Sequence, residues 1–74
     1  MMTRNDLETK YCDLLTYIIE NKGSNMLDSI LTDIGMTESE YYYIENVNTL
    51  RLIAIIENMQ IYARTNIHME EQNG

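Results

Sequence analysis

The sequence lacks the covalent and metal links that small proteins often use to stabilise themselves. Its 74 residues include one cysteine, so no disulfide can form within the chain, and one histidine, so no zinc-ligand spacing is present. A core of this size contributes only about 3–5 kcal/mol of net stability, and small chains commonly add a disulfide, a metal or a partner chain. We therefore expect one helical domain over residues 1–74 that associates with a second copy or with another protein.

Basic residues are also scarce. Five Lys and Arg stand against twelve Asp and Glu, which gives a net charge of −7, and the five are spread singly along the chain. Binding to nucleic-acid phosphates or to anionic membranes relies on clustered basic residues, so we expect direct contact with neither. The charge is instead suited to steering the chain toward a basic protein surface.

Long apolar runs and targeting signals are missing too. No apolar run approaches the roughly 18 residues of a membrane span, and the N-terminal residues lack a basic segment followed by an apolar one. A reducing, cytoplasmic setting is the expectation.

Side chains suited to catalysis are few and poorly placed. His68 lies in a polar tail at about residues 65–74, and Cys12 borders the apolar stripe of the first helix, where we expect it to be buried and inert. Acidic pairs such as Asp28 and Asp33 lack the loop geometry of a calcium site. The sequence therefore predicts no enzyme, no cofactor and no metal site.

Apolar residues at 3-4 spacing predict helices, and no window has the period of two that is typical of strands. A first helix is expected from Asn5 to Lys22, capped by Thr3 or Asn5 and stopped by Gly23. A short second helix follows a cap at Ser24 or Asn25 and is stopped by a further glycine at position 35. The expected inner-face residues are Leu7, Tyr11, Leu14, Leu15, Ile18, Ile19, Met26, Leu27, Ile30, Leu31 and Ile34.

The third helix has the clearest start signal. Thr37 is a candidate cap, and Glu40 three residues later completes a capping box, while Met36 and Tyr41 can pack as a hydrophobic staple. Such a cap contributes on the order of 1 kcal/mol. It predicts a turn of about two residues between the second and third helices.

A fourth helix is expected from Leu50 to about Arg64. The preceding residues are weak helix formers, so we expect a turn near Val47 and a cap at Asn48 or Thr49. One continuous helix from Glu38 onward is the alternative.

This fourth helix begins with an apolar run in which six of seven residues, 50–56, are apolar. A helix that is apolar all round must be buried on all sides. It is either the central core helix of one chain or the interface of a homodimer, and we expect the dimer. The predicted seam is Leu52, Ile55, Ile56, Met59 and Tyr62.

Three tyrosines occupy the consecutive positions 41–43, which point about 100° apart on a helix. Tyr41 is expected to pack inward with Ile44, which leaves the other two at least partly outward. An aromatic ring with a polar tip suits a protein interface, and flanking carboxylates would steer a basic partner toward it. A dimer that buries both tyrosines is the competing interpretation. The predicted partner surface is Glu38, Tyr42, Tyr43 and Glu45.

Residues 30–44 also have the pattern of a helix-turn-helix, with Gly35 at the turn. The helix that would read bases offers glutamates and no Arg or Lys, whereas base reading relies heavily on Arg, Lys, Asn and Gln. A stand-alone DNA-binding repressor is therefore an alternative function. A second alternative is a small acidic inhibitor that mimics nucleic acid and blocks a basic enzyme, as some phage proteins do.

Residues 14–64 resemble FlhD, the small subunit of the enterobacterial flagellar transcriptional activator. The similarity is carried by the segments Ile34-Gly35-Met36-Thr37-Glu38, Glu57-Asn58, Gln60-Ile61, Arg64 and the apolar stretch 13–19. The resemblance implies an all-helical, intertwined homodimer that regulates transcription together with a second subunit, FlhC. It implies neither a catalytic residue nor a cofactor.

Two features depart from that family. Its C-terminal extension, associated with promoter binding, has no counterpart after Gly74. Its protomer-linking cysteine aligns near Ala63, and Cys12 is not its equivalent. The resemblance thus implies a dimeric subunit of a bacterial or phage regulator that binds a protein partner, either an FlhC-like subunit or another basic protein, rather than a protein that activates transcription by itself.

Overall fold

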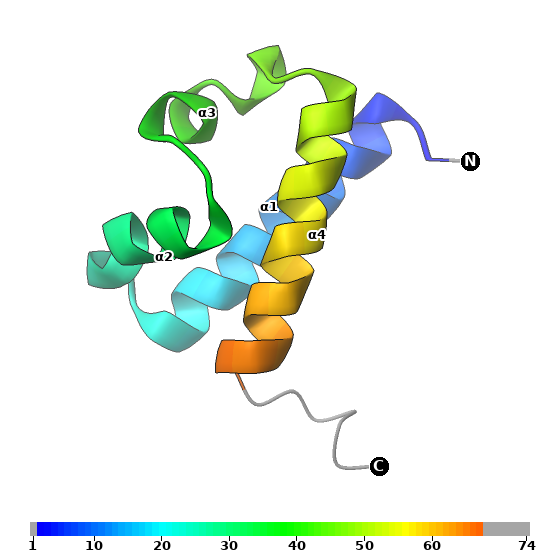
Figure 1. Cartoon of the computed structure of the whole chain (residues 1–74). Coiled ribbons are helices and arrows are strands. Elements are labelled where there is room, and N and C mark those ends of the chain that lie inside the picture. The colour runs from blue at the N-terminus through cyan, green and yellow to red at the C-terminus, as the bar shows by residue number, and fades with distance from the viewer. Residues whose placement is uncertain (1, 68–74) are drawn as a thin grey trace, which may run out of the picture.

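The computed structural model describes residues 2–67, and these are all-helical, with no strand among them (Figure 1). The all-α class expected from the sequence is confirmed. Two of the four α-helices are long and two are short, and two 3₁₀ segments link them. The elements in chain order are α1 (Arg4–Lys22), η1 (Ser24–Met26), α2 (Leu27–Ile34), α3 (Glu38–Tyr42), η2 (Ile44–Asn46) and α4 (Thr49–Asn66).

Helix α1 begins one residue earlier than predicted, because Thr3 rather than Asn5 caps it. The Thr3 hydroxyl accepts a hydrogen bond from the Asp6 backbone N–H, and the Asp6 carboxylate accepts one from the Thr3 N–H. This reciprocal pair satisfies two backbone donors that a helix start leaves without partners. The helix ends at Gly23, whose φ of 96° favours glycine.

The second helix differs from the prediction at its start. Residues 24–26 form a 3₁₀ turn, and α2 proper begins at Leu27. Met26, predicted on the inner face, is 42% exposed. A 3₁₀ segment has three residues per turn, so a 3.6-residue period extended back from α2 no longer predicts which way Met26 points. The end at Gly35 is confirmed, with a left-handed φ of 82°.

The predicted capping box of α3 is present. Thr37 Oγ1 accepts a hydrogen bond from the Glu40 N–H at 3.1 Å, and Glu40 Oε1 accepts one from the Thr37 N–H at 3.0 Å. The helix stops after Tyr42, and Asn48 then caps α4 by accepting a hydrogen bond from the Arg51 N–H at 3.0 Å. The chain therefore breaks between α3 and α4, and the alternative of one continuous helix is wrong.

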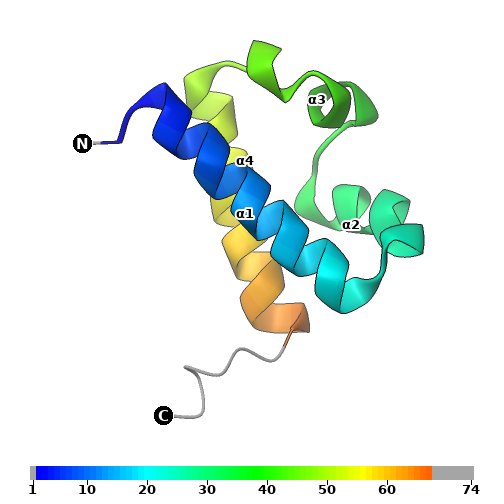
Figure 2. The same ribbon diagram turned by 180° about the vertical axis from the view of Figure 1, so that it is seen from behind.

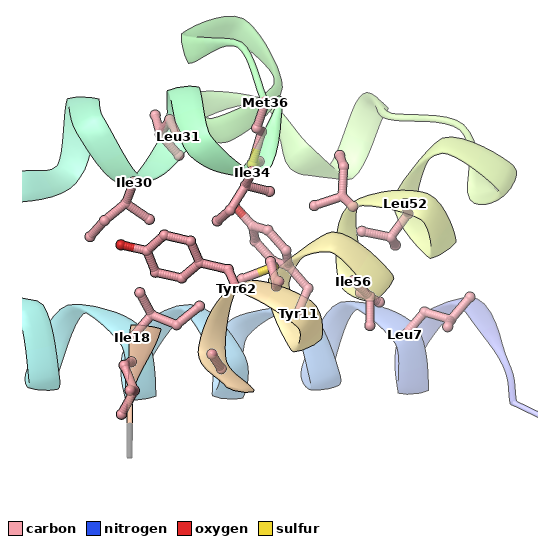
Figure 3. Close-up of a cluster of buried hydrophobic side chains, with 14 residues drawn as sticks. Leu7, Tyr11, Ile18, Ile30, Leu31, Ile34, Met36, Leu52, Ile56 and Tyr62 are labelled. Carbon is pink, nitrogen blue, oxygen red and sulfur yellow. The ribbon is translucent and has the colours of Figure 1, made fainter. Parts of the chain in front are cut away.

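The core lies where α1, α2 and α4 meet. Helices α1 and α4 pack along each other, and α2 lies beside them (Figure 1, Figure 2). Side chains from α1 and α2 point toward one another, with residues of α4 filling the space between (Figure 3). The buried residues are Leu7, Tyr11, Ile18, Ile30, Leu31, Ile34, Met36, Leu52, Ile55, Ile56, Met59, Tyr62, Ala63 and Ile67.

Helix α4 extends two residues beyond its predicted end, to Asn66, and Ile67 is buried. The first residues of the expected polar tail therefore belong to the fold. His68 lies outside the described residues.

The five residues predicted to form the dimer seam are all buried within the single chain, where each is 0–7% exposed. Uncovering all five would cost on the order of 10 kcal/mol, which is more than a domain of this size holds in reserve. Two chains folded in this way cannot meet through them. An interface formed by these residues requires two copies to exchange helices, and that arrangement stays a prediction. The five residues are Leu52, Ile55, Ile56, Met59 and Tyr62.

Candidate functional site

The predicted partner surface lies on α3 and η2, which lead from α2 to the start of α4 along one edge of the molecule (Figure 1). All four of its side chains are exposed. Tyr42 is 66% exposed and Tyr43 is 58% exposed, so neither ring belongs to the core of this chain. We call this surface the α3 corner, and its residues are Glu38, Tyr42, Tyr43 and Glu45.

One of the two exposed rings is braced by a neighbour. The half-buried Tyr41 packs against the core, as expected. Its ring lies 5.1 Å from that of Tyr42, centroid to centroid, at an interplanar angle of 64°. Edge-to-face pairs of this kind are favourable by about 0.5–1.5 kcal/mol. Tyr42 is therefore exposed yet supported, which lowers the entropy that a partner must remove on binding.

Arg51 fixes the start of α3 to the rest of the molecule. Its Nε lies 2.7 Å from Glu40 Oε2, and its Nη2 donates to Glu40 Oε1 at 3.0 Å, so the ion pair is bidentate. The same Nη2 donates to the Gly35 carbonyl oxygen at 2.6 Å, which places a cation at the C-terminal end of α2. One guanidinium thus joins α2, α3 and α4.

This ion pair changes the charge balance at the corner. The hydrogen bond from Arg51, followed by the one from the Thr37 N–H, lowers the pKa of Glu40 to about 2, although partial desolvation opposes the change. Glu40 is therefore ionised at neutral pH, and Arg51 neutralises it. The carboxylates left to meet a partner are Glu38 and Glu45, neither of which forms an ion pair with another residue of the described range 2–67.

Arg4 fixes the other end of the corner. Its Nη2 donates to the Ile44 carbonyl oxygen at 3.1 Å, and its Nη1 donates to Thr49 Oγ1, also at 3.1 Å. Its Nε lies 2.8 Å from Glu8 Oε2 on the same helix. Arg4 and Arg51 thus hold α3 and η2 from both sides, and two of the chain's five basic side chains serve the fold.

A groove runs between this corner and the start of α4. Its volume is about 460 Å³. The ring of Tyr43 and the side chain of Val47 give it an apolar part beside the ion pair, so it can receive one side chain of a partner. The groove is lined by Ser39, Glu40, Tyr43, Asn46, Val47, Asn48 and Arg51.

Sequence reasoning identified the exposed residues of the corner and missed the arginines that hold it. The sequence offers one indication of the role of Arg51, because it is the single charged residue in the apolar run 50–56. Its partner Glu40 lies eleven positions earlier on a different helix, and no local pattern connects the two. No feature of the sequence indicates the role of Arg4.

Residues outside the corner offer little chemistry within the described range. Cys12 is exposed, which corrects the expectation that it is buried: it follows the buried Tyr11, and one step of about 100° turns it to the solvent side of α1. No three His, Cys, Asp or Glu side chains among residues 2–67 are grouped so that they could hold a metal ion. Over the same residues, no helix has the length and apolar character needed to cross a membrane.

Comparisons with protein-family models, with curated proteins and with solved structures gave no match to this chain. The resemblance to FlhD therefore rests on the quoted sequence segments alone.

Proposed function

We propose that this chain is a non-enzymatic regulatory protein that binds a basic partner protein through the α3 corner, in transcription control as a subunit similar to FlhD. The observation that carries the proposal is the pair of exposed tyrosines on a corner held by two arginines. Interfaces are enriched in aromatic anchors within a polar rim, and rigid anchors lose little entropy on binding.

Charge supports a basic partner. Residues 2–48 contain nine acidic and three basic side chains, and one of those three, Arg4, is engaged in holding the corner. The field around the corner is therefore negative and favours approach by a positively charged surface. We expect this binding to weaken as salt rises, because screening shortens the reach of the field.

The test is the double variant Tyr42→Ala/Tyr43→Ala in a pull-down from host lysate, followed by affinity measurement with the purified partner. Truncating one aromatic hot spot costs at least about 2 kcal/mol, or about 30-fold in affinity, so we expect the double variant to lose at least that much. The matched control is Met2→Ala/Met26→Ala, which removes two exposed apolar side chains elsewhere and should keep the affinity. A folded double variant that binds its partner as tightly as the unaltered chain contradicts the proposal.

The same experiment separates the alternatives. A nucleic-acid mimic would bind a basic enzyme through its many carboxylates, so its affinity would fall with salt and would not depend on the two tyrosines. A stand-alone repressor would shift a specific DNA fragment in a gel without any partner.

A further inference from the structure

A pocket separate from the groove at the α3 corner lies between the C-terminal end of α2 and the second half of α4. Its volume is about 500 Å³, within the range of about 300–1,000 Å³ that is usual for ligand pockets. It shares no lining residue with that groove or with the α3 corner. We call it the α2–α4 pocket, and its lining includes Thr32, Asp33, Asn58, Ile61, Tyr62 and Asn66.

The fold uses the hydrogen-bond donors of three side chains in this pocket. Thr32 Oγ1 donates to the carbonyl oxygen of Asp28 at 3.0 Å, so only its lone pairs remain. Asn58 Nδ2 donates at 2.9 Å to the carbonyl oxygen of the last residue of α2. Asn66 Nδ2 donates at 3.0 Å to the carbonyl oxygen four residues earlier. Neither amide oxygen accepts a hydrogen bond from residues 2–67, so these side chains offer acceptors to a ligand.

A carboxylate and a largely buried hydroxyl complete this set of acceptors. Asp33 is exposed and forms no ion pair with another residue of the range 2–67. Tyr62 is 7% exposed, and its ring reaches from α4 toward α2 (Figure 3). Its hydroxyl makes no hydrogen bond with the described residues. Burial, followed by the nearby charge of Asp33, raises the pKa of this hydroxyl, so it is neutral and can accept a hydrogen bond.

The charges around the pocket favour a cation. No Lys or Arg among residues 2–67 lines it. Arg51 donates to the carbonyl oxygen of Gly35, which also lines the pocket, but Glu40 balances the charge of this arginine. Asp33 therefore supplies an unbalanced negative charge among neutral acceptors. A ligand without donors would displace water from these acceptors and leave them unpaired, which is unfavourable.

We propose that the α2–α4 pocket binds an arginine side chain of the partner protein. The N–H donors of a planar guanidinium can reach several acceptors at once, whereas the ammonium of lysine is a compact point charge. The methylene stem of the arginine packs on Ile61, which is 53% exposed. This binding rests on the proposed function only in that the partner is a basic protein, and the pocket lies outside the α3 corner.

The first test uses N-acetyl-arginine methylamide as a probe and follows the isotope-labelled full chain by NMR. We expect saturable shifts of the Asn58 and Asn66 side-chain amides, with a dissociation constant in the millimolar range. The citrulline analogue has a similar shape and no charge. We expect it to bind at least about 10-fold more weakly, because charge-assisted hydrogen bonds are about twice as strong as neutral ones.

Three outcomes of this titration overturn the proposal. They are equal binding of the two probes, shifts that do not saturate, and shifts that lie outside the pocket. Free arginine that binds at least about 10-fold more tightly than the blocked probe would indicate a metabolite site, and it too overturns the assignment to a protein side chain.

Two variants on the same helix separate the pocket from the net charge. Asp33→Asn removes the carboxylate of the pocket, and we expect the affinity for the arginine probe to fall at least about 5-fold. The matched control, Asp28→Asn, makes the same change of charge at an exposed position outside this pocket and should keep the affinity. Equal effects of the two variants overturn the proposal.

The same two variants are then measured with the purified partner. Asp33→Asn should weaken binding at least about 10-fold relative to Asp28→Asn, and Tyr42→Ala/Tyr43→Ala should leave probe binding unchanged. A partner that needs the tyrosines and tolerates Asp33→Asn overturns this inference alone. A partner that tolerates the loss of both tyrosines contradicts the proposed function alone.

Discussion

At the scale of single residues, two polar side chains, Arg51 and Tyr11, affect the stability of the fold in opposite directions. Arg51 joins three helices, although in the sequence it is only the one charged residue of the apolar run 50–56. Tyr11 shows the opposite case. It is 2% exposed, and its hydroxyl finds no hydrogen-bond partner among residues 2–67.

The Arg51–Glu40 pair predicts how stability depends on pH. Because the pKa of Glu40 is lowered from 4.5 to about 2 in the folded chain, its contribution is present above about pH 4.5 and is lost as the pH falls toward 2. Glu40→Gln keeps an amide oxygen for the capping box but removes the charge. We expect it to lower the free energy of unfolding by about 1 kcal/mol at pH 7 and to differ little from the unaltered chain near pH 2.

Urea unfolding followed by circular dichroism at several pH values measures this difference. The control is Glu38→Gln, which removes an exposed carboxylate that forms no ion pair with another residue of the range 2–67. An equal loss of stability for Glu40→Gln at pH 7 and at pH 2 would show that the ion pair is not the cause.

The buried hydroxyl of Tyr11 predicts a stabilising substitution. Burial raises its pKa, so the group is neutral, but a buried polar group without a partner still costs about 1–3 kcal/mol. Tyr11→Phe keeps the ring and removes the hydroxyl, and we expect the unfolding free energy to rise by about 1 kcal/mol in urea titration. Tyr43→Phe, at an exposed position, should have no effect. A clear loss of stability in the Tyr11 variant would mean that its hydroxyl does have a partner.

At the scale of elements, short-range signals set the helix boundaries. The caps at Thr3, Thr37 and Asn48 and the stop at Gly35 were all predicted or among the stated alternatives, because each rests on hydrogen bonds within a few residues. The start of α2 was not predicted correctly, because the 3₁₀ turn that precedes it has no side-chain cap. The break between the α3 corner and α4 was predicted from the same kind of local signal, the cap at Asn48.

Gly35 gives a prediction at this scale. Its φ of 82° is left-handed, and an added Cβ would meet no atom within 4 Å, so the cost of a side chain is conformational rather than steric. We expect Gly35→Ala to lower the unfolding free energy by about 1 kcal/mol and Gly35→Asn to lower it less, because asparagine tolerates this conformation better. Thermal and urea unfolding measure both. An alanine variant as stable as the unaltered chain would contradict a left-handed residue 35.

At the scale of the whole molecule, the short third dimension of the fold explains why one side of α4 is exposed. The shortest extent over Cα atoms is 16 Å, which leaves room for two layers of helices, since packed helix axes lie about 8–10 Å apart. Helix α4 can therefore be covered on one side only.

The sequence by itself determined that the chain is helical, where most helices begin and end, and which residues of α4 share a face. Leu52, Ile55 and Met59 were grouped correctly by periodicity, with a central core helix and a dimer interface as the two interpretations; within the single chain they are buried in the core that α4 forms with α1 and α2. Periodicity fixes which side chains point the same way because the helix repeat is local. It does not specify what covers that face, which depends on contacts between residues far apart in the chain, and only the tertiary structure decided it. The pairing of Arg51 with Glu40 was decided at the same level, and it holds the tyrosines of the α3 corner in place.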